Sequence, residues 1–573
     1  MRIAALPLAL LMLCACTPNN NGASTTDAEA QAPADAMAAT SAHEFSPAID
    51  AGDFEEHVKT LASDAFSGRA PGTTGEDASI EYIKTQFARI GLQPGNGSDW
   101  FQTVPMVETI AEESAVLNVK VGDAQQALKF GTDMVVGTRT GQQHVSIKDS
   151  ELVFIGYGVD APERNWNDYA GIDVKGKTVV MLVNDPGFHV NDAKLFDGKR
   201  MTYYGRWTYK FDEAARKGAA AALIIHDSPG ASYGWDVVKN SWSGPQYDLQ
   251  AKDDPAPRLP VQGWITGEAA NALFKAAGQD LDKLRAAANK PGFKAVPLDA
   301  IASLDLNSKT AEKSSRNVMG LLPGSETPEE AIVYMAHWDH LGTHEGETGD
   351  NIYNGAVDNA TGVAGILEIA EAFRKAKTPP KRSILFLSVT LEESGLLGSK
   401  YYVAHPVIPL DKTVAVFNLD ALSPVGKARN ITVIGKGSSE LEDLLKTETD
   451  KQQRRIVDEN NIASGFYFRS DHFNFAKAGV PALYINSGLD LVEGGATAGD
   501  AAGKDYNENR YHKPGDQYDA ATWNLEGIVQ DLETVFTIGE ILANDGKWPN
   551  WYEGNPFKAA HDAMHPSSAA PAK

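Results

Sequence analysis

The residues with the clearest chemical potential are acidic side chains and histidines in the second half of the chain. They are His337, Asp358, Glu392, Glu393, Asp420 and His512. Imidazole and carboxylate ligands without sulfur suit Zn²⁺ or a similar divalent ion in a catalytic site rather than a structural one. The four carboxylates would repel one another if they gathered without a metal, and no Lys or Arg is their neighbour in sequence. A pair of ions sharing one bridging carboxylate therefore explains such a cluster better than salt bridges do.

Short apolar segments precede most of these residues and must position them. The runs 331–336, 384–389 and 414–419 are almost continuously apolar, which is what central strands of a parallel sheet need because both faces are covered. His337 follows the first run, the two glutamates follow the second and Asp420 follows the third. The segment 362–375 has helical apolar spacing, and Asp358 lies just before it. The side chains thus converge where parallel strands end, the usual place for a site in an open α/β sheet.

The predicted fold class is α/β, with a mostly parallel-stranded mixed sheet flanked by helices in three layers and an inserted β-rich domain. Residues 46–134 begin the main domain, and apolar spacing in 54–61 and 80–90 predicts two helices, the second ended by Gly91. Short strands and turns fill residues 135–295, the inserted domain. The main domain resumes over residues 296–557. The Ala/Ser/Pro-rich stretch 558–573 is predicted to be a disordered tail.

Composition excludes several classes of protein. The 573 residues carry 52 Lys+Arg and 76 Asp+Glu, a net charge of −24, so nonspecific binding to nucleic acid or to anionic lipid through a basic patch is not expected. Hydrophobic residues make up 42% of the chain, which is ample for a large core. Both cysteines lie within the first 16 residues, so neither a disulfide framework nor a thiolate metal site is expected in the folded body.

The N-terminus has the features of an export signal. Residues 1–15 contain one Arg and a short apolar run, too short to span a bilayer. Residues 13–16 resemble a bacterial lipobox, which implies cleavage after Ala15 and a lipid on Cys16; ordinary signal cleavage is the alternative. Residues 16–45 form a polar tether. We therefore expect an exported bacterial lipoprotein, anchored through Cys16 on the periplasmic or cell-surface side, with no other membrane contact.

Five motifs resemble the zinc aminopeptidase family with co-catalytic metals, which includes bacterial leucyl aminopeptidases, aminopeptidase Y and glutamate carboxypeptidase. They are AHWDHLG (336–342), GAVDNATG (355–362), TLEESGLLGS (390–399), FNLDALS (417–423) and YHKPGDQYD (511–519). The motif SGRAPGTTG resembles the family's entry loop. Residues 150–225 resemble the protease-associated domain that many members carry. The resemblance implies a hydrolase that removes N-terminal residues from peptide substrates with two Zn²⁺ ions, or with Co²⁺ or Mn²⁺ in their place.

The same resemblance implies a role for each motif residue. His337 and Asp420 would bind one metal, Glu393 and His512 the other, and Asp358 would bridge them. Glu392 would be the general base for the attacking water. Asp339 would orient His337, and Asp516 would do the same for His512.

Other interpretations remain open at this level. His340 and His344 lie near His337; His340 is expected to be part of the pocket wall. Asp471 and His472 are either close to the site or structural. The aromatic residues Tyr203, Tyr204, Trp207 and Tyr209 either overhang the site or form the core of the inserted domain.

Several functions remain open as well. A carboxypeptidase or dipeptidase of the same family is the main alternative. A glutaminyl-cyclase-like acyltransferase and a non-catalytic receptor are disfavoured, because the former works with one metal and the latter would have lost ligands or the base.

Overall fold

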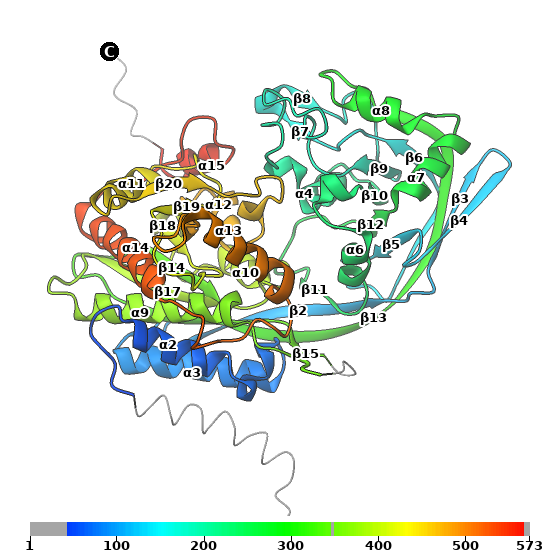
Figure 1. Ribbon diagram of the computed structural model, residues 1–573. Helices are drawn as coiled ribbons and strands as arrows, with labels where there is room; N and C mark the ends of the chain where they lie inside the picture. The colour runs from blue at the N-terminus through cyan, green and yellow to red at the C-terminus, as the bar shows by residue number, and fades with distance from the viewer. Residues whose placement is uncertain (1–42, 345–348, 567–573) are drawn as a thin grey trace, which may run out of the picture.

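The computed structural model describes residues 43–344 and 349–566 (Figure 1). Two amphipathic helices open the described chain, α2 (Ala51–Leu61) and α3 (Thr74–Ile90). Asp50 caps α2 by accepting hydrogen bonds from the backbone N–H groups of Gly52 and Asp53. Gly91 ends α3 with φ of 88°, a left-handed conformation that favours glycine. Both predicted helices are therefore confirmed, and the segment between them, expected to be a loop, contains a short 3₁₀ turn (Asp64–Arg69).

The main sheet has four adjacent parallel strands in the order β17 (Arg382–Val389), β14 (Thr327–His337), β18 (Thr413–Asn418) and β21 (Ala482–Ser487). Antiparallel strands flank this centre. On one side β13 (Val296–Leu322) pairs with β17 and with β2 (Phe101–Ala111). On the other side β19 (Asn430–Val433) pairs with β21, and β20 (Arg455–Asp458) pairs with β19. The sheet is mixed but parallel at its centre, as predicted.

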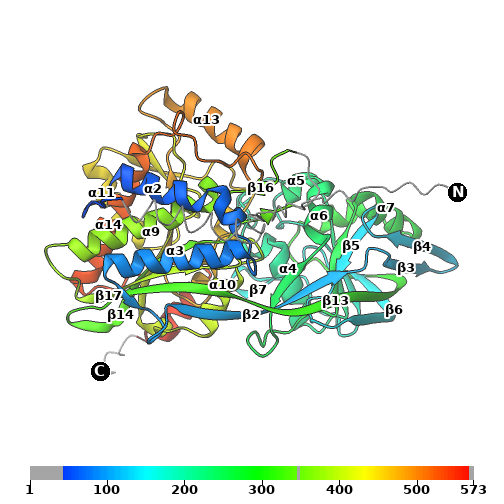
Figure 2. The same cartoon turned by 90° about the horizontal axis from the view of Figure 1, so that it is seen from below.

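Helices cover both faces of this sheet and make three layers (Figures 1 and 2). Alternate residues of β14 show how both faces are buried: Ile332 and Tyr334 pack toward one face, and Val333 and Met335 toward the other. The first face is covered by α2, α3, α9 (Thr361–Lys375) and α14 (Glu526–Asp545), and the second by α10 (Leu397–Ala404) and α12 (His472–Lys477). The three predicted apolar runs are strands because only a doubly covered sheet buries every residue of each run.

A second sheet lies beside the first and shares one strand with it. The 27-residue strand β13 runs through both sheets and is the long ribbon that joins the two parts in Figure 2. Its first half pairs with β3 (Val116–Val121) and β6 (His144–Phe154). Beyond β6, the sheet continues through β9 (Thr178–Leu182), β10 (Ala221–Ile225), β12 (Val261–Ile265) and β5 (Met134–Gly137).

The second sheet has its own apolar core and its own helices, among them α4 (Trp207–Arg216), α6 (Trp235–Trp242), α7 (Gly267–Ala276) and α8 (Leu281–Ala288). The stretch 135–295 lies within this unit, which also includes β3 and β4 (Ala124–Lys129) and part of β13. The unit is thus larger than the predicted stretch 135–295, and from here on the inserted domain means residues 116–307.

The C-terminal tail differs from the prediction of disorder. Lys558–Met564 forms helix α15, and His561 within it is buried with its Nδ1 3.0 Å from the backbone oxygen of Gly479. Met564 and His565 also pack on the main domain, so tertiary contacts order a segment whose composition alone favours disorder. Among the described residues, no helix is both long and apolar enough to cross a membrane. Residues 1–42, including Cys16, lie outside the described part of the chain.

Candidate metal centre

The six predicted side chains gather at the carboxyl ends of the central parallel strands. His337 is the last residue of β14, Asp420 follows β18 by two residues, and Glu392 and Glu393 follow the end of β17 by three and four. Asp358 lies in the π-helical turn Ala356–Ala360 immediately before α9. Since parallel strands end at the same edge of a sheet, residues far apart in the sequence meet here.

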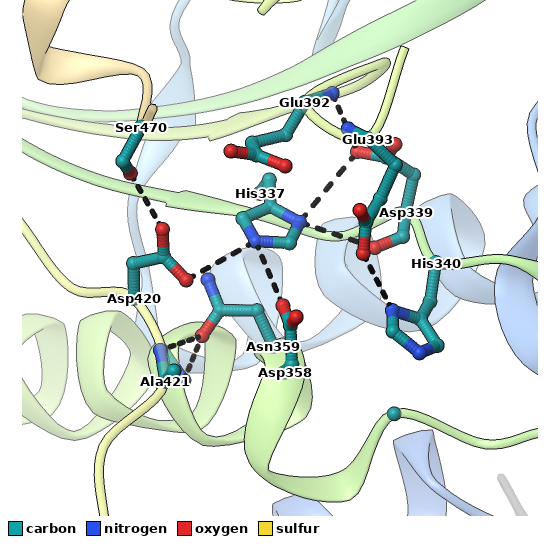
Figure 3. Close-up of polar contacts among 12 residues, drawn as sticks. His337, Asp339, His340, Asp358, Asn359, Glu392, Glu393, Asp420, Ala421 and Ser470 are labelled. Atoms are coloured by element: carbon teal, nitrogen blue, oxygen red, sulfur yellow. Dashed lines mark hydrogen bonds and ion pairs between the residues drawn. The ribbon is translucent and has the colours of Figure 1, made fainter. Parts of the chain in front are cut away.

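His337 lies between two carboxylates (Figure 3). Its Nε2 atom is 3.3 Å from Asp358 Oδ1 and 3.3 Å from Asp420 Oδ1. The other ring nitrogen, Nδ1, is 3.1 Å from the backbone oxygen of Asp339. That contact fixes the ring so that Nε2 points into the cluster, the usual arrangement for a metal-binding imidazole.

The two neighbouring glutamates point in different directions. Glu393 lies 3.1 Å from His512 Nε2 and 2.7 Å from His340 Nδ1. Glu392 instead lines the adjacent cavity, and its carboxylate makes no ion pair or hydrogen bond within the described chain. The chain turns sharply here, with Gly395 at φ of 101°, as expected for both glutamates to reach one site.

Two histidines approach Glu393. His512 Nε2 also lies 3.2 Å from Asp358 Oδ2, so this imidazole contacts both carboxylates that the resemblance assigns to its metal. His340 was expected in the pocket wall, but it does not line the cavity and lies buried behind Glu393. Its Nε2 atom is also buried and has no hydrogen-bond partner among the described residues. His340 is thus a second possible ligand on this side.

The two supporting aspartates act through the backbone. The Asp339 carboxylate accepts hydrogen bonds from the N–H groups of Glu392 (3.2 Å) and Glu393 (3.4 Å), so it positions the glutamate pair. Its Oδ1 atom is 3.8 Å from His337 Nδ1, which is too long for a hydrogen bond. Asp516 accepts from the N–H groups of Val357 and Asp358, both at 3.0 Å. Asp516 therefore holds the Asp358 segment, whereas the sequence interpretation paired it with His512.

Sequence reasoning missed Arg69, which holds the backbone on both sides of the site through hydrogen bonds. The buried guanidinium donates to the backbone oxygens of Leu61, Trp338, Asn354 and Gly355 at 2.6–2.9 Å. It makes no ion pair with a carboxylate among the described residues, so the acidic cluster is not neutralised by a salt bridge. The only sequence signal was its place in the SGRAPG motif, because long-range donation to backbone oxygens leaves no pattern in the sequence.

Two further polar side chains support the acidic ligands. Ser470 donates to Asp420 Oδ2 at 2.6 Å. Asn359 donates to the backbone oxygen of Leu419 and accepts from the N–H of Ala421, tying the two ligand-bearing segments together. The neighbouring Asp471 accepts from Ser399, and both ring nitrogens of buried His472 lack partners among the described residues. The Ser-Asp-His segment thus reaches the site through its serine.

The electrostatics follow from burial and from crowding of charge. Burial opposes protonation of His337, but the nearby Glu392 and Asp420 outweigh it and raise its pKa well above the usual value. Burial raises the pKa of Asp339 to about 7. Burial also acts to raise the pKa of Glu393, but His512 outweighs it and the result is about 2. Burial lowers the pKa of Arg69 to about 10, so it remains a cation at neutral pH.

A cavity of about 370 Å³ opens directly beside the cluster. Asp358, Glu392, Asp420 and His512 form part of its wall, so a molecule in it would touch the acidic centre. The rest of the wall comes from Val357 and from residues in the segments 421–434, 459–470, 484–489 and 500–511. None of these residues belongs to the inserted domain.

The aromatic run of the inserted domain therefore does not overhang the site. Tyr204 and Tyr209 belong to the core of that domain, and Trp207 packs on Trp242. Tyr203 instead contacts Phe468 and Phe473 of the main domain. The structure favours the interpretation of this run as core and interface.

The donor set fits a divalent metal. Ligand atoms of His337, Glu392 and Asp420 lie within 4.8 Å of one another, and so do those of His340, Asp358 and Glu393. Imidazole nitrogens face carboxylate oxygens at 2.7–3.3 Å in both groups. Such a buried gathering of hard oxygen and imidazole ligands is typical of Zn²⁺.

Comparison with known proteins agrees with the motifs. Residues 317–537, which contain all six predicted side chains, match the model of Peptidase family M28. A probable leucine aminopeptidase 2 from Aspergillus oryzae is 29% identical over 259 residues, 42% of this chain and 48% of that protein. A glutamate carboxypeptidase 2 homolog from Caenorhabditis elegans is 27% identical over 197 residues, 32% of this chain and 23% of that protein. The resemblance to zinc aminopeptidases is thereby confirmed for this part of the chain.

The matches cover only part of each related protein. The chain spans less than half the length of these curated relatives. Among solved structures, an aminopeptidase from Aneurinibacillus sp. strain AM-1 is 20% identical with a TM-score of 0.47, covering 86% of this chain and 94% of that one.

Proposed function

We propose that this protein is a di-metal zinc aminopeptidase that removes N-terminal residues from peptides. The observation that carries the proposal is the division of labour between neighbouring glutamates: Glu393 contacts two imidazoles, and Glu392 faces the cavity without a partner among the described residues. A permanent ligand and a free proton acceptor are the two groups that metal-assisted hydrolysis needs. His337 and Asp420 would hold one ion and Glu393 and His512 the other, with Asp358 between them.

The chain's own residues then perform definite tasks. Bound zinc would lower the pKa of water and polarise the scissile carbonyl. Glu392 takes the proton of the attacking water and returns it to the leaving amine. Asp339 fixes the backbone of Glu392, and Ser470 holds Asp420 in place. The acidic cavity favours the free amine of a peptide N-terminus over a carboxylate.

The test compares two matched variants. Glu392→Gln keeps the shape of the side chain and removes its proton affinity, so metal content should stay at two per chain while kcat falls at least about 100-fold. Glu393→Gln should weaken metal binding itself and be partly rescued by added zinc. Metal content by mass spectrometry and kcat on aminoacyl reporters are measured on the same samples. Full activity of Glu392→Gln, or metal loss there and not in Glu393→Gln, would contradict the assignment.

A second candidate, hydrolysis of short peptides by recognition of their free carboxylate, is favoured by two arginines. Arg469 lines the cavity, and Arg206 of the inserted domain lies near Arg469. Burial and the charge of Arg469 lower the pKa of Arg206 to about 10. Neither guanidinium makes an ion pair within residues 43–344 and 349–566, and Arg469, which lines the cavity, is therefore available for an anion. N-blocked peptides with a free C-terminus distinguish the candidates, because an aminopeptidase does not cleave them.

We also propose that the protein is a lipoprotein anchored through Cys16, on the evidence of its lipobox-like N-terminus, and that the inserted domain is a protease-associated domain. Cys16→Ala should move the protein from the membrane fraction to the soluble fraction. Unchanged fractionation of the variant would count against lipidation.

A further inference from the structure

The inserted domain contributes no residue to the cavity wall, but it contacts a segment of that wall from the side opposite the cavity. The wall segment 459–470 follows β20 and carries Glu459, whose side chain is 6% exposed. One oxygen of Glu459 accepts from the backbone N–H of Gly435 at 2.8 Å. The other accepts from the guanidinium of Arg200 at 3.5 Å, and Arg200 also pairs with Asp458. A cation of the inserted domain thus reaches a carboxylate of the cavity.

Backbone and packing contacts surround this pair. The N–H of Met201 donates to the backbone oxygen of Ile462 at 3.0 Å, in the same wall segment. Met201 also packs against Gly465, whose φ of 61° is a left-handed conformation that favours glycine. Next along the inserted domain, Tyr203 packs on Phe468. Residues 200–203 therefore cover the back of the segment whose front lines the cavity.

The covering segment is itself held rigidly. Thr202 donates its N–H to Asp185 at 2.6 Å and its hydroxyl at 3.0 Å, and Asp185 is fully buried. Asp185 in turn lies near buried Lys210, whose ammonium donates to the backbone oxygen of Tyr157 at 2.6 Å. Arg200 is thereby anchored to the core of the inserted domain.

From these contacts we propose that Arg200 is a specificity-determining residue. It positions residues 458–465, which include the first part of the wall segment, and it neutralises Glu459, so that the cavity accepts uncharged substrate side chains. The inference rests on the proposed peptidase function. Without Arg200, Glu459 presents an uncompensated carboxylate to the cavity, which would bind a cationic side chain. A merely structural contact would change all substrates alike.

The test compares selectivity at pH 8 in Arg200→Ala, in Arg200→Lys and in the double variant Arg200→Ala/Glu459→Gln. Two dipeptide series carry Lys or the nearly isosteric Met at the first or the second position. In Arg200→Ala, kcat/KM for Lys relative to Met should rise about tenfold at one position, the scale of one hydrogen bond to a charged group. Arg200→Lys should keep the wild-type ratio, and Glu459→Gln should abolish the rise. Arg164→Ala is the control, because Arg164 is similarly exposed and pairs with Asp197 inside the inserted domain.

An unchanged ratio at both positions, or a rise that persists in the double variant, would overturn the inference. Hydrogen exchange of residues 458–465 provides a readout that needs no activity: exchange should quicken in Arg200→Ala and not in Arg164→Ala. Equal exchange in wild type and Arg200→Ala would also overturn it. A wild-type protein inactive on every peptide would reject the proposed function, and the exchange result would still decide the positioning role.

Discussion

Arg69→Lys should destabilise the main domain while preserving charge, because the guanidinium has four backbone acceptors and an ammonium has only three donors. At least one buried carbonyl oxygen would lose its partner, at a cost of about 1–3 kcal/mol. The acceptors lie on different sides of the planar guanidinium, at Leu61, Trp338, Asn354 and Gly355, so a compact ammonium cannot reach all of them. We expect a total loss of about 3 kcal/mol, which corresponds to a fall in Tm on the order of 5 °C.

The assay is thermal and urea unfolding of metal-loaded protein, with metal content measured in parallel. Arg374→Lys on α9 is the matched control, because this arginine is exposed and its replacement should change stability by less than about 0.5 kcal/mol. Two of the acceptors flank metal-site segments, so Arg69→Lys should also weaken zinc binding. A variant with the stability and zinc affinity of the wild type would refute the claim that Arg69 braces the site.

Three further expectations follow from burial and charge. Burial raises the pKa of Glu368 to about 8, against 4.5 in the unfolded chain, so the stability that this group contributes is lost as pH rises from about 5 to 8. Glu368→Gln should therefore raise Tm relative to wild type at pH 8 and not at pH 5. Glu533→Gln, at an exposed position, should change Tm at neither pH. Lys210→Met should destabilise the inserted domain by about 1–3 kcal/mol in urea unfolding, because the buried ammonium donates to the backbone oxygens of Tyr157 and Tyr204, and these oxygens would lose that partner. Zinc at about 100 times the Kd of one site should stabilise the metal-free protein by about 2.7 kcal/mol through that site, and Glu393→Gln should lose the shift of its own site at the same zinc concentration.

The sequence predicted the elements whose burial is uniform. The runs 331–336, 384–389 and 414–419 could be identified as central strands because a strand covered on both faces is apolar along its whole length. Their order in the chain then placed His337, Glu392 and Asp420 at one edge. The tail helix was missed because it is held by tertiary contacts of His561, Met564 and His565, which no local pattern records.

The supporting contacts were predicted less well than the ligands, for a physical reason. A ligand is limited to a few residue types, whereas a backbone N–H or oxygen can be bound by a polar side chain from anywhere in the fold. Asp339 and Asp516 were predicted to support imidazoles. Asp339 does contact His337, but through its backbone oxygen, and the carboxylates of both aspartates accept from backbone N–H groups. Arg69 was missed for the same reason.

The position of these supports explains how a cluster so rich in negative charge keeps its shape. Asp339 and Asp516 do not approach the ligands as free carboxylates; each accepts two backbone N–H groups and so directs its charge away from the cavity. The Arg69 guanidinium supplies positive potential near Asp358 and Glu393, although its N–H groups donate to backbone oxygens. Among the described residues, Asp358, Glu392 and Asp420 thereby face the cavity without an ion pair to Lys or Arg, an arrangement that fits a divalent metal.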